Sequence, residues 1–200
     1  MELENYKSFP QNISVIVEDE IFIYPFMIAP IFLSDEQNIA AANVALQNND
    51  LVMIVTNKQG MDGHRDEGSF FDVGTIGSIM RKVALPDGRV KLLLQGLSRG
   101  KIEYLVSSNP IIASVDLLRS EAYSESKVNA AISILKEQLR MLSSVNNHYP
   151  QDILRTIDEN HEPKRIVDRV ASTLRIKKYA IYRLFSETDV QETFNAYRLY

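Results

Sequence analysis

Few residues in this sequence stand in patterns that catalysis or metal binding requires. The chain has three widely separated histidines: His64, His148 and His161. A metal site or a catalytic triad built from them would need the fold to bring distant segments together. Ser126-Lys127 has no glycine-rich context, and Glu18-Asp19-Glu20 is more typical of a solvated turn than of paired catalytic carboxylates. We therefore predict no catalytic residue and no metal ligand in this chain.

Nucleotide-binding motifs are also missing from the sequence. A phosphate-binding loop needs Gly-x-x-x-x-Gly-Lys followed by Ser or Thr, and no such string occurs. Gly74 and Gly77 lack a third glycine and precede an expected strand rather than a helix. There is no cysteine, which excludes disulfides, thiolate metal sites and a cysteine nucleophile. We predict that the chain itself binds no cofactor.

The pattern most suggestive of binding is apolar. Tyr24, Pro25, Phe26 and Met27 form a turn-prone cluster of aromatic and methionine side chains between two expected strands. One interpretation is that Phe26 and Met27 close a small β core. The other is that the cluster is an exposed, adaptable patch that holds unfolded protein segments, a task for which methionine and aromatic side chains are well suited. The sequence allows both interpretations.

Residues 1–120 are predicted to form a β domain with one helix. The expected strands are 13–17, 21–25, 27–33, 51–56, 73–85, 89–96, 101–106 and 111–118. Helical spacing of Ile39, Ala42 and Leu46 behind Ser34 predicts a helix over 35–48 that Ser34 caps. Residues 58–69 have the composition of a surface loop, and Pro86-Asp87-Gly88 predicts a hairpin turn. Many short strands favour a small, curled, barrel-like sheet.

Residues 121–200 are predicted to be helical. The first helix has an apolar stripe along one face, made by residues that are three or four positions apart: Val128, Ile132, Leu135, Leu139 and Leu142. Further helices are expected from about 150, from Pro163, over 178–185 and over 189–200. Tyr179, Tyr182 and Phe185 are more typical of a core than of a site. We expect the last helix to continue beyond Tyr200, because no cap or breaker ends it.

The composition excludes several classes of protein. The chain is 45% hydrophobic and 24% charged, as in globular proteins, and its net charge of −4 comes without a basic stripe for nucleic acid. The longest apolar run, 21–33, contains two prolines and is too short to span a bilayer. The first twenty residues have no apolar core of a secretory signal, so we expect a cytoplasmic protein without membrane or nucleic-acid partners.

Four blocks of the sequence have a recognisable order and spacing. They are Tyr24-Pro25 with Met27 and Ala29-Pro30-Ile31-Phe32; Asp72 to Gly77; Leu85 to Lys91 with Gln95 to Arg99; and Pro163 to Leu174. In their order along the chain and in their spacing, these blocks resemble the N-terminal domain of the ATP-dependent Lon protease family. The resemblance covers nearly the whole chain. Gly77 stands where that family commonly has alanine, and Thr193-Phe194 replaces its usual Arg-Leu.

The resemblance implies an α+β fold, with a PUA-like β pseudo-barrel over 1–120 and a helical bundle over 121–200. It also implies a non-catalytic region that selects misfolded and degron-bearing proteins and supports hexamer assembly, with ATP and Mg used elsewhere in the parent serine protease. Two alternatives remain. One is a stand-alone adaptor with this fold. The other is an RNA-binding PUA-like domain, against which the acidic balance of the β region argues.

Overall fold

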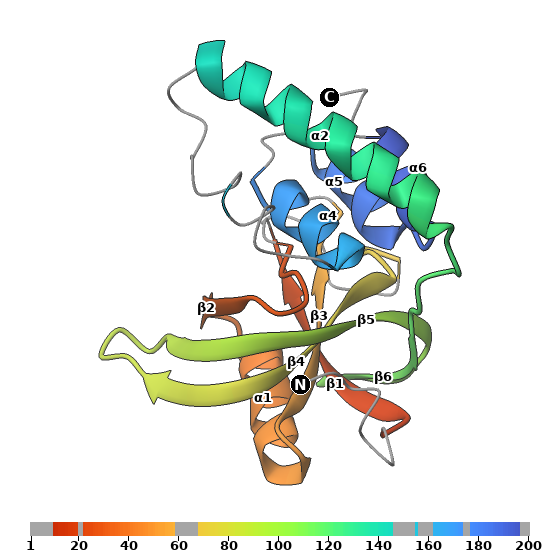
Figure 1. Ribbon diagram of the computed structural model, residues 1–200. Coiled ribbons are helices and arrows are strands. Elements are labelled where there is room, and N and C mark those ends of the chain that lie inside the picture. Colours follow the sequence, from red (N-terminus) through yellow and green to blue (C-terminus); the bar gives the residue numbers. More distant parts are fainter. Residues whose placement is uncertain are drawn as a thin grey trace. The chain divides into compact units, whose positions relative to one another are not determined.

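The computed structural model describes residues 10–19, 22–58, 68–145, 155, 162–173 and 177–196. These residues form a six-stranded sheet and helices α1, α2, α4, α5 and α6, which confirms the predicted α+β class (Figure 1). The chain divides into two compact units, Met1–Leu118 and Arg119–Tyr200. All of the described strands lie in the first unit together with α1.

The sheet closes on itself except for one added strand. Its strands are β1 Asn12–Glu18, β2 Ile28–Leu33, β3 Leu51–Thr56, β4 Val73–Ala84, β5 Val90–Ser108 and β6 Ile111–Leu117. The order is β2-β5-β4-β3-β1-β6, and β5 also pairs with β6, so β5, β4, β3, β1 and β6 form a ring. Among the strands that the structure describes, only β1 and β3 run parallel. β2 pairs with the first part of β5 and lies outside the ring, as an edge strand.

Two predicted strands proved to be one. β5 has 19 residues and covers both 89–96 and 101–106, which were expected as separate strands. Its first part pairs with β2 and its second part with β6, with register shifts against β4 and β6. A Cβ at Gly100 would lie 2.8 Å from side-chain atoms of Ile76 and Val115. Glycine therefore lets the long strand bend closely over its neighbours where the sequence suggested a break.

The predicted strand over 21–25 is wrong for its described part, 22–25, which forms no strand. Pro25 lies in a turn there, and the side-chain hydroxyl of Thr75 rather than a neighbouring strand donates a hydrogen bond to the carbonyl of Ile23. The hairpin turn at 86–88 is confirmed. The Leu85 N–H donates to the Arg89 carbonyl over 2.8 Å, and Gly88 has φ of 86°.

Helix α1 spans Glu36–Asn48, and Asp35 rather than Ser34 caps it. The Asp35 carboxylate accepts a hydrogen bond from the Asn38 N–H over 2.8 Å. The buried residues of α1 are Asn38, Ala41, Ala42 and Ala45, so the inward face is rotated from the predicted one. The inward face of α1 includes the polar Asn38. The spacing of the apolar residues alone predicts that Asn38 lies on the surface.

The β unit has two apolar clusters. One lies between α1 and the part of the sheet that carries β2: Ile16, Ile23, Ile31, Leu33, Ala41, Ala42, Ala45, Val52, Ile54, Ile79, Val90, Leu92 and Leu94. The other comes from the strands of the ring and Phe70: Ile13, Val15, Val17, Leu51, Met53, Val55, Phe70, Ile76, Leu97, Ile111, Ala113 and Val115. β2 belongs to the first cluster through alternate residues only, which leaves its other side chains on the outer face.

The second unit contains α2 Glu125–Val145, α4 Pro163–Ala171, α5 Lys178–Ser186 and α6 Val190–Ala196. Four residues of the predicted α2 stripe are buried: Val128, Ile132, Leu135 and Leu139. α2 contacts α4 and α6, and Pro163 opens α4 as predicted. The expected helix from 150, apart from the helical Arg155, and most of the loop over 58–69 lie outside the described residues. None of the helices within the described ranges has the length and apolar character needed to cross a membrane.

Candidate functional site

Tyr24 to Met27 form a tight turn that leads into β2. The Met27 N–H donates to the Tyr24 carbonyl over 3.2 Å, Pro25 occupies the second position, and Phe26 at the third has φ of 65°. This arrangement corresponds to a type II turn, in which glycine or asparagine usually takes the third position. The left-handed conformation of Phe26 therefore stores strain of about 1–2 kcal/mol.

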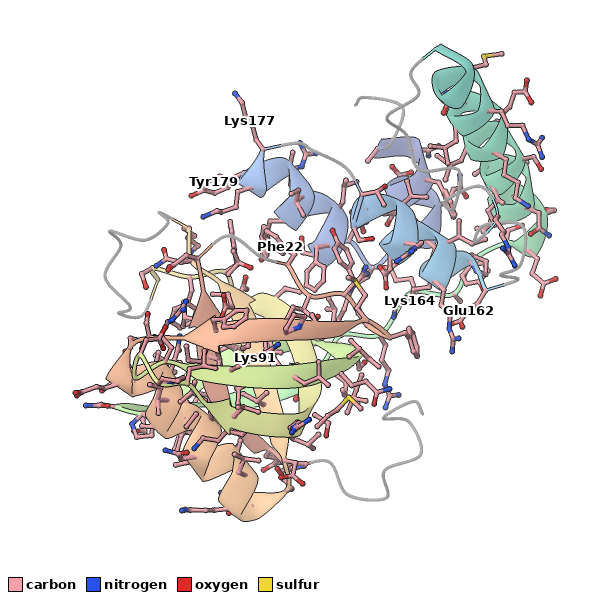
Figure 2. All side chains as sticks on the ribbon, turned by 90° about the vertical axis from the view of Figure 1, so that its left-hand side faces the viewer. Phe22, Lys91, Glu162, Lys164, Lys177 and Tyr179 are labelled. Atoms are coloured by element: carbon pink, nitrogen blue, oxygen red, sulfur yellow. The ribbon has the colours of Figure 1, made fainter. Side chains whose placement is uncertain are left out.

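The sheet holds this strained turn in place. The Phe26 N–H donates to the Gly96 carbonyl, and the Gly96 N–H donates to the Met27 carbonyl, each over 2.8 Å. A Cβ at Gly96 would lie 2.4 Å from the Tyr24 carbonyl oxygen, so only glycine allows this close approach. Before the turn, the Phe22 ring lies 6.0 Å from that of Phe71, centroid to centroid (Figure 2 labels Phe22).

The structure separates the four residues of the predicted patch. Tyr24 and Pro25 are buried, whereas Phe26 and Met27 are partly exposed. Tyr24 has only 2% of its surface accessible and so contributes to the core. Phe26 and Met27 are the two members of the patch that a partner could contact.

Large apolar side chains continue from this turn along the outer face of β2. Ile28 is 56% exposed and Phe32 48% exposed, with the exposed Pro30 between them. In the ladder, Pro30 lies opposite the half-buried Leu93 of β5. We define the β2 surface as these side chains together with the turn: Phe26, Met27, Ile28, Pro30, Phe32 and Leu93.

The sequence did not indicate that Ile28, Pro30 or Phe32 belongs to the site. The run Ile28–Leu33 is apolar on both faces, so the residue types alone do not show which face is exposed. α1 covers only one of these faces. Pro25 and Pro30 predict from the sequence that the strands over 21–25 and 27–33 lie at a sheet edge or break at a bulge, because proline has no N–H for the ladder. For 27–33 this prediction is confirmed, since β2 is an edge strand.

Cationic side chains border the β2 surface. The Arg89 guanidinium and the Lys91 ammonium lie 5.7 and 5.5 Å from the centroid of the Phe32 ring (Figure 2 labels Lys91). Arg81 on β4 lies opposite Leu93 in the ladder. Arg89 also forms a 2.6 Å salt bridge with Asp87, and its hydrogen bonds hold the pKa of the Asp87 carboxyl below its usual value. The arrangement suits apolar contact with a partner that carries negative charge.

The described residues include no grouping of three His, Cys, Asp or Glu side chains that could hold a metal ion. His64, His148 and His161 lie outside the described ranges. The absence of catalytic, metal and cofactor residues therefore stays a prediction from the sequence.

The aromatic set in the helical unit also divides. Phe185 is buried and Tyr182 is partly exposed. Tyr179 is 59% exposed and projects outward beside Lys177 at the start of α5 (Figure 2). Phe185 thus packs in the core as expected, while Tyr179 lies on the surface.

Solved structures share this fold. The N-terminal domain of a Lon protease from the Mycobacterium avium complex matches 92% of this chain and 94% of its own, with a TM-score of 0.73 and 20% identity. The Lon N-terminal domain protein from Xanthomonas campestris matches 94% of this chain and 98% of its own, with a TM-score of 0.64 and 12% identity. At these identities the likeness concerns the fold.

Sequence comparisons identify the family. The Lon protease of Campylobacter concisus is 45% identical over 96% of this chain and 24% of its own length, and that of Helicobacter pylori strain 26695 is 34% identical over 93% and 22%. The chain thus spans about a quarter of the length of these relatives. The family model for the ATP-dependent protease La (LON) substrate-binding domain matches residues 12–196. The chain therefore belongs to the family of Lon protease substrate-binding domains.

Proposed function

We propose that this chain is the non-catalytic recognition and assembly region of an ATP-dependent Lon serine protease, and that its β2 surface holds exposed apolar segments of misfolded or degron-bearing proteins. The observation that carries the proposal is the exposure of Ile28 and Phe32 beside the strained turn at Phe26. Large apolar groups that lie together on a surface are typical of protein-binding sites.

The chemistry of proteolysis would take place elsewhere in the parent protein. ATP and Mg would act in other modules, and the parent would work in the cytoplasm, without membrane or nucleic-acid partners of this region. Each domain would bind an unfolded segment weakly, and a hexamer would strengthen the binding by presenting six β2 surfaces to one chain. A stand-alone adaptor is not favoured, because the matched relatives are Lon proteases.

The architecture would serve this task through two domains, 1–120 and 121–200. We interpret the ring of β5, β4, β3, β1 and β6 as the PUA-like pseudo-barrel and the helical unit as the bundle of the Lon N-terminal region. In this arrangement the ring would hold β5 rigid, and pairing with β5 would hold β2 in place. The strand β2 would therefore be ordered before an unfolded protein segment binds to it.

The proposal is tested by removing the two most exposed side chains of the β2 surface. We expect Ile28→Ser combined with Phe32→Ser to weaken binding of a permanently unfolded protein at least about tenfold, because two half-exposed anchors lose their apolar contacts. Affinity is measured by titration of the full chain, and a thermal melt shows whether the fold survives.

The chain offers a matched control on the second part of β5. Tyr104 is 61% exposed and Val106 is 51% exposed, so Tyr104→Ser combined with Val106→Ser removes similar apolar surface away from β2. We expect this control to bind as the parent chain does. Equal weakening by both double variants, or by neither, would contradict the assignment of binding to the β2 surface.

A further inference from the structure

β2 presents an open backbone edge as well as apolar side chains. It pairs with β5 along Ile28–Leu33, and among the described residues no strand lies on its other side. The hydrogen bond from the Gly96 N–H to the Met27 carbonyl shows that Met27 faces β5. Since residues of an antiparallel ladder alternate in direction, Ala29, Ile31 and Leu33 also face β5. Their even-numbered neighbours turn their backbone groups to the open side.

The open edge therefore offers the N–H groups of Ile28 and Phe32 and the carbonyls of Ile28, Pro30 and Phe32. Pro30 has no N–H to offer, and it stands where the ladder with β5 requires none. The side chains of the same three residues are exposed on the outer face. An extended partner beside β2 could thus meet backbone donors and acceptors at both ends and apolar side chains along one face.

Charge limits which partner fits this edge. Arg81 lies in the same cross-strand row as Pro30 and Leu93, and Lys91 lies opposite Phe32. Within the described ranges neither cation forms a salt bridge. Arg89 is paired with Asp87. This border is cationic although the whole chain has a net charge of −4. A complementary partner carries an acidic side chain near Phe32.

We propose that the β2 surface binds its partner by strand addition. An extended segment of about five or six residues, apolar at alternate positions and acidic beside Phe32, pairs its backbone with Ile28 and Phe32. The inference rests on the proposed function and adds to it the conformation and charge of the bound segment. A second copy of β2 is a poorer occupant, because the cationic borders of the two copies would lie together.

Alternate N-methylation of a peptide tests the backbone pairing. The parent peptide is an acetylated and amidated octapeptide that alternates valine and threonine, with glutamate at one end. One isomer is N-methylated on its valines and the other on its threonines, so each loses the donors of one edge only. We expect one isomer to bind at least about tenfold more weakly, since pairing hydrogen bonds are lost, while the other binds like the parent. Hydrogen exchange at the Ile28 and Phe32 amides should slow with the parent peptide.

Two results would overturn strand addition: both isomers bind as the parent does, or both lose binding equally. Binding of the unfolded protein shows whether strand addition alone is wrong or whether the proposed function is wrong as well. If Ile28→Ser with Phe32→Ser still abolishes that binding, the proposed function stands and only strand addition fails. If the unfolded protein does not bind the parent chain at all, both proposals fail.

Charge reversal tests the acidic preference. We expect Lys91→Glu to weaken binding of the glutamate octapeptide roughly threefold to tenfold and to strengthen binding of a lysine version. Lys101→Glu is the matched control, an exposed lysine farther along β5 that pairs with Val73 and Asp116. Equal effects of the two variants would refute the local charge contact. A dimer in light scattering that Ile28→Ser with Phe32→Ser abolishes would assign the edge to a second copy and overturn the proposal.

Discussion

At the scale of single residues, Phe26 has a strained backbone conformation and also contributes its side chain to the proposed binding surface. Its φ of 65° is unfavourable for a residue with a Cβ, yet hydrogen bonds to Gly96 and Tyr24 hold the turn around it. The aromatic side chain remains partly exposed next to Ile28. A glycine would relieve the backbone strain there but would remove the apolar group.

We expect Phe26→Val to be less stable than Phe26→Gly by about 1 kcal/mol, although valine keeps more apolar surface, because a β-branched side chain is the most strained in the left-handed region. Urea denaturation of the two variants measures the difference. A valine variant that is the more stable of the two would show that the turn stores no strain.

At the scale of elements, Asn38 joins α1 to β1. Its side-chain oxygen accepts from the Val17 N–H over 3.0 Å, and its side-chain nitrogen donates to the Val17 carbonyl over 2.9 Å. β6 pairs with β1 only along Asn12 to Ser14, so the amide of Asn38 acts as a strand neighbour farther along β1. This explains why a polar residue is buried on the inner face of α1.

Asn38→Ala should lower the free energy of unfolding by about 2–4 kcal/mol, because it leaves two buried backbone groups without partners. Asn43→Ala on the same helix is the control. Asn43 accepts a hydrogen bond from Lys82 at the surface, and its loss should change stability by less than about 0.5 kcal/mol. Urea denaturation followed by amide signals of β1 compares the two, and equal losses would refute the role of Asn38.

The elements also show where the sequence was informative. The continuous apolar run Leu51–Thr56 and the proline-aspartate-glycine turn gave β3 and the β4–β5 hairpin, because these signals are local. The extent of β5 and the inner face of α1 depend on contacts between distant residues, such as Gly100 with Ile76 and Asn38 with Val17. Apolar periodicity contains no information on such contacts.

At the scale of the whole molecule, the family could be predicted from four ordered blocks, but the binding surface could be predicted only in part. Tyr24 and Phe26 are close in sequence and similar in type, yet one is buried and the other partly exposed. Whether Ile28 and Phe32 are covered depends on which strand lies at the edge of the sheet, and strand order is set by the complete set of pairings. The proposed hexamer would repeat this edge six times, so weak single contacts could hold one unfolded chain.

The most direct test of the account is an NMR titration of the isotopically labelled chain with a permanently unfolded protein at high concentration. We expect the largest amide shifts over 26–32 and at Leu93, with Tyr104 and Val106 unchanged. No shifts, or shifts confined to other parts of the chain, would contradict the claim that the β2 surface binds unfolded protein segments.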